Sequence, residues 1–185
     1  MTDHYFLAIP LADELRIMTC QAATPFMNNI HYKRRTNPAD LHCTLLFFGA
    51  LDEEKRAAVV QTVSQISRRH HSFHLKLSGI DGFGEKHRPR VLFASLFPNQ
   101  ELHQLRSDLG QALSIIGFNI EKRPFHPHIT LAKRWIDGEM RVDLPITDCA
   151  ITGKSWEVCS MMLFKVQPET LPHYLPVFEF PFLGE

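Results

Sequence analysis

The chain has 185 residues, of which 44% are hydrophobic and 22% charged, as in a globular protein with its own core. Its 20 Lys and Arg balance 20 Asp and Glu, which excludes binding to nucleic acid by overall positive charge alone. No apolar run is long enough for a membrane helix, and the N-terminus lacks the pattern of a signal peptide. The four cysteines form no Cys-x-x-Cys pair, so we expect reduced thiols and a cytoplasmic protein without membrane association.

The first part of the chain predicts a strand, a helix, a loop and a second strand. Residues 5–9 are an apolar run typical of a strand, and Asp13 is expected to cap the following helix. The basic residues 33–35 are expected in a loop. The turn signal at 37–40 precedes an apolar run over 41–49 that predicts a buried strand.

In the rest of the chain, segments with the apolar spacing of helices again alternate with segments that have the spacing of strands. Acidic residues at the start of one segment and basic residues at its end favour a helix, and alternating apolar residues favour strands. The predicted elements are a helix over 52–69, a strand over 73–77, a loop over 81–90, a strand over 91–95, a helix over 102–116 and strands over 128–132, 146–151, 157–166 and 174–180.

Two halves of the chain share one order of elements. Phe6 lies in a strand 36 positions before His42, and Phe93 lies in a strand 35 positions before His128. A helix and a proline-bearing loop separate the members of each pair. This spacing indicates an internal duplication, with two similar lobes facing each other across a pseudo-twofold axis.

Each half ends on the same short motif, His-x-Thr-Leu. Residues two apart in a strand point to the same face, so His42 projects with Thr44, and His128 with Thr130. If the lobes face each other, two imidazoles and two hydroxyls meet in one cleft. Imidazoles titrate near neutral pH and serve as general acid and base, while hydroxyls can donate to phosphate oxygens. The motif pair therefore predicts phosphoryl chemistry.

These motifs, with residues 37–49 and 125–132 around them, resemble those of the 2H phosphoesterases, especially the RNA 2′,3′-cyclic phosphodiesterase branch formerly described as 2′-5′ RNA ligases. The resemblance covers nearly the whole chain, residues 1–185, as a single bilobal domain with one His-x-Thr motif per lobe. It implies an α+β fold of two antiparallel sheets flanked by helices, with a central groove. It also implies hydrolysis of an RNA terminal 2′,3′-cyclic phosphate to a 2′-phosphomonoester, with no metal ion or cofactor.

Within this interpretation His42 and His128 are the catalytic residues, and Thr44 and Thr130 bind the phosphate. Either histidine can take either role; we take His42 as the acid and His128 as the base.

The expected partners are RNA or oligonucleotide ends, with no obligate protein partner. Lys133 and Arg134 follow the second motif and are candidates for substrate binding, although the family often has arginine at the position of Lys133. Phe47 is expected either to stack on a base or to belong to the core.

Three alternative functions share these residues. They are 2′-5′ RNA ligation, hydrolysis of small cyclic nucleotides, and binding of RNA ends without turnover. A separate cluster, His70, His71 and His74, has the residue type of a metal site, but we expect solvated histidines at a helix end there.

Overall fold

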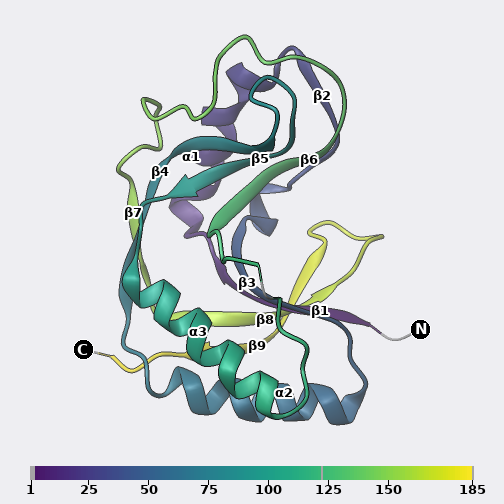
Figure 1. Ribbon diagram of the computed structural model, residues 1–185, viewed down its shortest axis with the longest axis vertical. Coiled ribbons are helices and arrows are strands. Elements are labelled where there is room, and N and C mark those ends of the chain that lie inside the picture. The colour runs from purple at the N-terminus through teal and green to yellow at the C-terminus, as the bar shows by residue number, and fades with distance from the viewer. Residues whose placement is uncertain (1–2, 122, 185) are drawn as a thin grey trace.

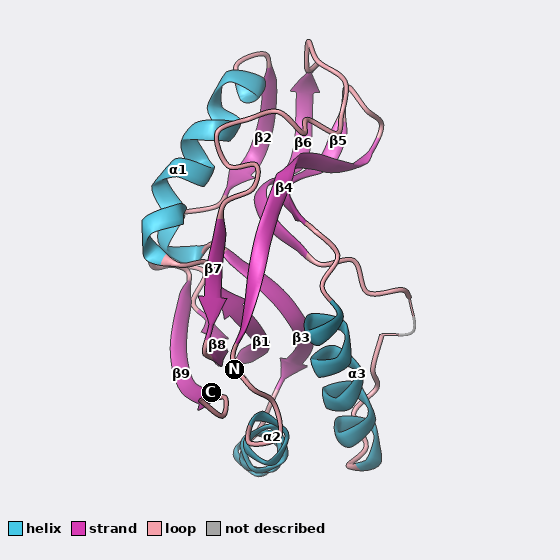
Figure 2. Cartoon of the chain, turned by 90° about the vertical axis from the view of Figure 1, so that its left-hand side faces the viewer, coloured by secondary structure: helices cyan, strands magenta, loops and turns pink. Residues whose placement is uncertain are grey.

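The computed structural model describes residues 3–121 and 123–184, which form an α+β fold around one long, curled antiparallel sheet (Figures 1 and 2). The fold class expected from the sequence is confirmed. The strands are β1 (His4–Pro10), β2 (Ile30–Arg35), β3 (His42–Ala50), β4 (Phe73–Gly84), β5 (Pro89–Leu96), β6 (His128–Gly138), β7 (Ser155–Val158), β8 (Ser160–Val166) and β9 (Tyr174–Pro181). The helices are α1 (Asp13–Ala23), α2 (Glu53–Ser67) and α3 (Gln100–Ile115), with short 3₁₀ helices η1 (Thr24–Met27) and η2 (Pro38–Asp40).

The sheet has two halves that meet at one point. The strand order is β7-β4-β5-β6-β3-β1-β8-β9, and β2 pairs with β6 outside this path. We call β3, β1, β8 and β9 the first half-sheet, and β7, β4, β5, β6 and β2 the second half-sheet. Strands β3 and β6 share the Cα pair Cys43 and Ile129. The two sheets expected from the sequence are therefore joined into one path by this pair.

The two halves repeat one register around their motifs. In the first half-sheet β1 lies antiparallel to β3, which carries the first motif, and in the second β5 lies antiparallel to β6, which carries the second. In each pair, three residues of the first strand lie opposite the His, x and Thr positions of the motif. The equivalent Cα pairs are Pro10–His42, Ile9–Cys43 and Ala8–Thr44 in the first half-sheet, and Ser95–His128, Ala94–Ile129 and Phe93–Thr130 in the second. This agreement confirms the duplication that the spacing predicted.

The helices lie outside the sheet. Figure 2 places α1 beside β2, and Figures 1 and 2 both place α2 and α3 at the opposite end of the molecule. The Asp52 carboxylate accepts a hydrogen bond from the Lys55 N–H at 2.8 Å and starts α2, while the Asn99 side chain accepts from the Leu102 N–H at 2.7 Å and starts α3. Within the described ranges, no helix is long and apolar enough to cross a membrane.

Several sequence-based boundaries are wrong. The basic segment 33–35 belongs to strand β2, in which Ile30 and Tyr32 alternate with exposed residues. The expected loop over 81–90 shrinks to 85–88 because β4 and β5 extend into a long hairpin. The N-cap of α1 is Ala12 rather than Asp13, whose carboxylate instead pairs with Arg16 at 2.9 Å.

Two predicted strands near the C-terminal end also differ. Residues 146–151 form turns with one isolated bridge, between Ile80 and Ile146, instead of a strand. The segment 157–166 is divided at Cys159 into β7, which pairs with β4, and β8, which pairs with β1 and β9. The division lets one stretch of chain serve both half-sheets.

Candidate active site

His42 opens β3 immediately after the turn that η2 forms. The Asn37 side chain accepts a hydrogen bond from the Ala39 N–H at 2.9 Å and fixes this turn. The Asp40 carbonyl, 2.6 Å away, can only accept, so Nδ1 of His42 carries the proton. In the neutral ring Nε2 then has a free lone pair, and it lies 3.0 Å from Oγ1 of Thr44. The Thr44 hydroxyl therefore donates to His42.

Aromatic rings surround the imidazole of His42. Ring centroids lie 4.8 Å away for Phe6, 5.2 Å for Tyr174, which stands edge-on, and 6.1 Å for Phe164. Burial among these rings disfavours the charged imidazolium and is the main reason why the pKa of His42 falls to about 4. The ring is thus held neutral at neutral pH, with Nε2 able to accept a proton.

His128 opens β6 in the same manner. Its Nδ1 donates to the carbonyl of His126, two residues earlier, at 2.8 Å. The rings of Phe83 and Phe93 lie 5.0 and 5.2 Å away. Burial lowers the pKa of His128, and the charge of His126 acts in the same direction. Both motif histidines therefore use Nδ1 to fix the ring and leave Nε2 for chemistry.

Charges from the second half-sheet act on this centre. The charges of Lys133 and His128 lower the pKa of His42 further, although by less than burial does. Lys133 itself has a lowered pKa, caused first by burial and then by the neighbouring Arg34 and Arg134. The centre is consequently a positive environment that favours an anionic ligand.

A groove of about 1550 Å³ runs between the two half-sheets. Of the residues expected from the sequence, Thr44, Phe47, His128, Lys133 and Arg134 line it. Phe47 is 74% exposed and thus does not belong to the core. His42 and Thr130 do not line the groove. His42 contacts Thr44, which does line it, whereas Thr130 makes no hydrogen bond through its side chain in the described part of the chain.

The far wall of the groove contains a break in strand geometry. Lys133, Arg134 and Trp135 are consecutive, yet all three line the groove, whereas alternate residues of a regular strand face opposite sides. Arg134 has φ of 62°, in the left-handed region that residues other than glycine rarely adopt. This local conformation, which costs about 1–2 kcal/mol, turns the three side chains to one side.

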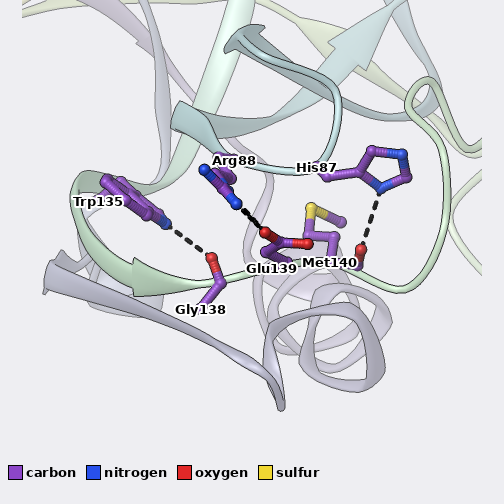
Figure 3. Close-up of polar contacts among 6 residues, drawn as sticks. All are labelled: His87, Arg88, Trp135, Gly138, Glu139 and Met140. Carbon is purple, nitrogen blue, oxygen red and sulfur yellow. Dashed lines mark hydrogen bonds and ion pairs between the residues drawn. The ribbon is translucent and has the colours of Figure 1, made fainter.

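Figure 3 shows how neighbouring contacts hold this wall. The Trp135 indole N–H donates to the Gly138 carbonyl at 3.1 Å, which fixes the ring at the groove. Nearby Arg88 is neutralised by Glu139. Within the described ranges no such ion pair involves Lys133 or Arg134, so their charges remain available to a ligand.

Sequence reasoning missed the role of Asp40. Its buried carboxylate accepts hydrogen bonds from the N–H groups of His173 and Tyr174 at 2.9 and 3.1 Å, while its carbonyl orients His42. The residue thereby connects the start of β9 to the imidazole. The sequence marks Asp40 only as part of a turn signal, and no local pattern points to partners more than 130 positions away.

The second histidine cluster does not form a site with the first. His70 is not solvated as expected, because its Nε2 pairs with Asp108 at 3.0 Å and its side chain is 13% exposed. His71 donates to the carbonyl of Gly184 at 3.1 Å, and His74 is exposed on β4. No group of three His, Cys, Asp or Glu side chains placed to hold a metal ion occurs in residues 3–121 and 123–184.

Comparison with known proteins identifies a family and several relatives of this chain. Residues 9–146 match the family model of the 2′-5′ RNA ligase superfamily. A Bacillus subtilis protein named RNA 2′,3′-cyclic phosphodiesterase is 33% identical over 183 residues, covering 96% of this chain and 95% of that protein. A Geobacillus stearothermophilus protein of the same name is 27% identical over 98% of this chain, which spans 58% of that longer protein.

Solved structures give the same result for the fold. LigT of E. coli in complex with 3′-AMP superposes with a TM-score of 0.80 at 25% identity, covering 98% of this chain and 99% of that one. A Thermus thermophilus protein superposes with a TM-score of 0.76 at 26% identity, with the same coverage of both chains.

Proposed function

The chain belongs to the 2′-5′ RNA ligase superfamily, and from this premise we propose that it is an RNA 2′,3′-cyclic phosphodiesterase. It opens a terminal cyclic phosphate with water and leaves a 2′-phosphomonoester. The observation that supports this most is the pair of motif histidines, in each of which Nδ1 donates to a carbonyl two residues earlier, so that in the neutral ring Nε2 carries no proton. Two such imidazoles at one centre are what an in-line displacement with two proton transfers needs.

We infer the roles of the two histidines from their surroundings. His42 is held neutral by its lowered pKa of about 4, and once the Thr44 hydroxyl in the groove turns to the phosphate, its Nε2 is the base that takes a proton from the attacking water. His128 lines the groove, and a bound phosphate anion favours its protonated form, so it is the acid. The water oxygen bonds to phosphorus, the bond from phosphorus to O3′ breaks, and O3′ receives the proton of His128. This reverses the assignment made from the sequence.

The remaining candidate residues serve binding. When substrate binds, the Thr44 hydroxyl turns from His42 and donates to a non-bridging phosphate oxygen. Thr130 donates to the other such oxygen, and Lys133 and Arg134 neutralise the charge of the phosphate. Phe47, exposed at the groove, stacks on the terminal base. The reaction needs no metal ion or cofactor, and residues 1–185 act as one bilobal domain with a motif in each lobe. We place it in the cytoplasm, in accordance with the four free cysteines.

The test uses a short RNA that ends in a 2′,3′-cyclic phosphate, with its products resolved as 2′- or 3′-phosphate. We expect the 2′-phosphate to accumulate with turnover, at the same rate in excess chelator. Joining to a 5′-hydroxyl end would indicate the ligase, and binding without turnover would indicate a binding module. A loss of rate in chelator that a divalent cation restores would contradict the metal-free reaction.

A further inference from the structure

Arg106 of α3 lies on the groove wall, at the end formed by α3 and the segment before His128. Its guanidinium stacks over the ring of Phe125, with the carbon Cζ 5.6 Å from the ring centroid. Gly110, one helical turn later, is also close to this guanidinium. A Cβ added there would lie 2.9 Å from Nη1 of Arg106, so a glycine leaves room for the guanidinium. The guanidinium of Arg106 is therefore packed against Phe125 and Gly110.

Nearby negative charge balances the positive charge of Arg106 only in part. Its Nε is buried and has no hydrogen-bond partner in the described part of the chain. None of the ion pairs found there includes Arg106. Burial lowers the pKa of the guanidinium, while the charge of Glu121 opposes this, and Glu121 itself pairs with Arg123 at 2.7 Å. A desolvated guanidinium with spare donors is suited to bind an anion that enters the groove.

The groove around it has the character of a single-strand channel. Its volume, about 1550 Å³, exceeds the range of roughly 300–1,000 Å³ typical of small-molecule pockets. Basic and aromatic side chains both line it, as in proteins that bind single-stranded nucleic acid. These lining residues are Phe47, Phe83, Arg90, Arg106, Arg123, Phe125, Lys133, Arg134 and Trp135.

We propose that Arg106 binds a backbone phosphate of the RNA strand upstream of the cyclic end, and that the protein consequently prefers oligonucleotides to cyclic mononucleotides. This inference rests on the proposed function. Backbone phosphates recur along a strand whatever its sequence, so one fixed guanidinium away from the reacting phosphate increases affinity without selecting bases. The stacking on Phe125 preorganises the planar donors for two phosphate oxygens.

A structural role gives a different expectation. Phe125 lies three residues before His128. In a purely structural role, the stacking of Arg106 on Phe125 would hold this segment in place and thereby position the histidine. Loss of that function would lower kcat for every substrate. Loss of a phosphate site would instead raise KM, and only for substrates that have an upstream phosphate.

The experiment compares Arg106→Gln with the wild-type protein on two substrates, a 2′,3′-cyclic mononucleotide and a short single-stranded RNA with the same cyclic end. We expect kcat/KM of the wild type to be higher for the RNA. Arg106→Gln should lower the RNA value on the order of ten-fold through KM and leave the mononucleotide unchanged. The slope of log kcat/KM against log salt should flatten by about 0.7, the value for one phosphate of a single strand.

Two further variants make the comparison specific. Arg106→Lys keeps the charge and should retain part of the RNA preference. Arg69→Gln removes an equal charge from an exposed residue outside the groove and should match the wild type. Equal losses on both substrates, an unchanged Arg106→Gln variant, or a wild type that treats both substrates alike would each overturn the inference.

Failure of the proposed function would look different. The wild type would then hydrolyse neither substrate. Titration with the RNA product, which ends in a 2′-phosphate, would still test the site, because Arg106→Gln should weaken this binding on the order of ten-fold whether or not turnover occurs. Equal affinity of the two proteins for this RNA would overturn the inference.

Discussion

Cys43 of β3 faces Ile129 of β6, and this Cα pair joins the two half-sheets. Both side chains are fully buried in the main core. The residues on either side of each therefore point to the opposite face, so His42 and Thr44 of one motif lie next to this pair on β3, and His128 and Thr130 of the other lie next to it on β6. A single contact between an apolar pair thus brings together all four polar residues of the two motifs.

We expect His42→Ala and His128→Ala each to lower kcat by about 10²- to 10⁴-fold, because each removes one proton-transfer group. The double variant should fall little below the worse single variant, since the two groups act as one unit. Steady-state kinetics on a cyclic-phosphate RNA measure this, with circular dichroism to verify the fold. A single variant that retains wild-type turnover would contradict the two-histidine mechanism.

An activated leaving group should separate the acid from the base. When the leaving group is an acidic phenol it departs without a proton, so His128→Ala should lose little of its rate on such a phosphodiester, whereas His42→Ala should stay severely impaired. The measurement is the ratio of kcat values on the phenol ester and on the RNA for each variant. The opposite pattern would restore His42 as the acid.

The sequence predicted the duplicated motifs because their chemistry repeats locally, at matching distances from Phe6 and Phe93. It did not predict β2, since exposed Lys33, Arg34 and Arg35 hide the alternation that Ile30 and Tyr32 begin. Three consecutive exposed basic residues end the alternation, so the segment lacks the pattern that predicts a strand.

Contacts between distant segments were also beyond sequence reasoning. Asp40 meets Tyr174 only because β9 returns alongside β8. Arg106 belongs to an amphipathic helix whose pattern predicts the buried leucines but says nothing about which polar residue meets the segment before His128. Such placements depend on tertiary packing, which local periodicity does not encode.

Asp40→Ala should lower both stability and kcat. The change leaves two N–H groups, of His173 and Tyr174, without their charged acceptor, at a cost of about 2–4 kcal/mol in the free energy of unfolding. Because these contacts hold Tyr174 against the ring of His42, kcat should fall by about ten-fold.

Asp40→Asn keeps one acceptor oxygen, so its stability and its kcat should fall by less than those of Asp40→Ala. Denaturant unfolding and steady-state kinetics give the two quantities, and Asp13→Ala, at an exposed carboxylate, is the control that should change neither by much. Wild-type stability in Asp40→Ala would contradict the role of the carboxylate.

Stability should fall as the pH is lowered from about 6.5 to 4, because of His42. Its pKa is about 4 in the folded protein, and about 6.5 in the unfolded chain. Between these values the unfolded state binds the extra proton, so protonation favours unfolding, and the loss is complete below the folded-state pKa. A shift of this size corresponds to about 3 kcal/mol.

Urea unfolding at several pH values between about 7 and 4 should therefore show a loss of that order in the wild type. His42→Gln, which cannot titrate, is expected to show a correspondingly shallower dependence, with the difference between the two proteins growing as the pH falls. Other carboxylates and histidines contribute equally to both proteins and cancel in this difference. Parallel curves would mean that the imidazole of His42 is not held neutral by its aromatic surroundings.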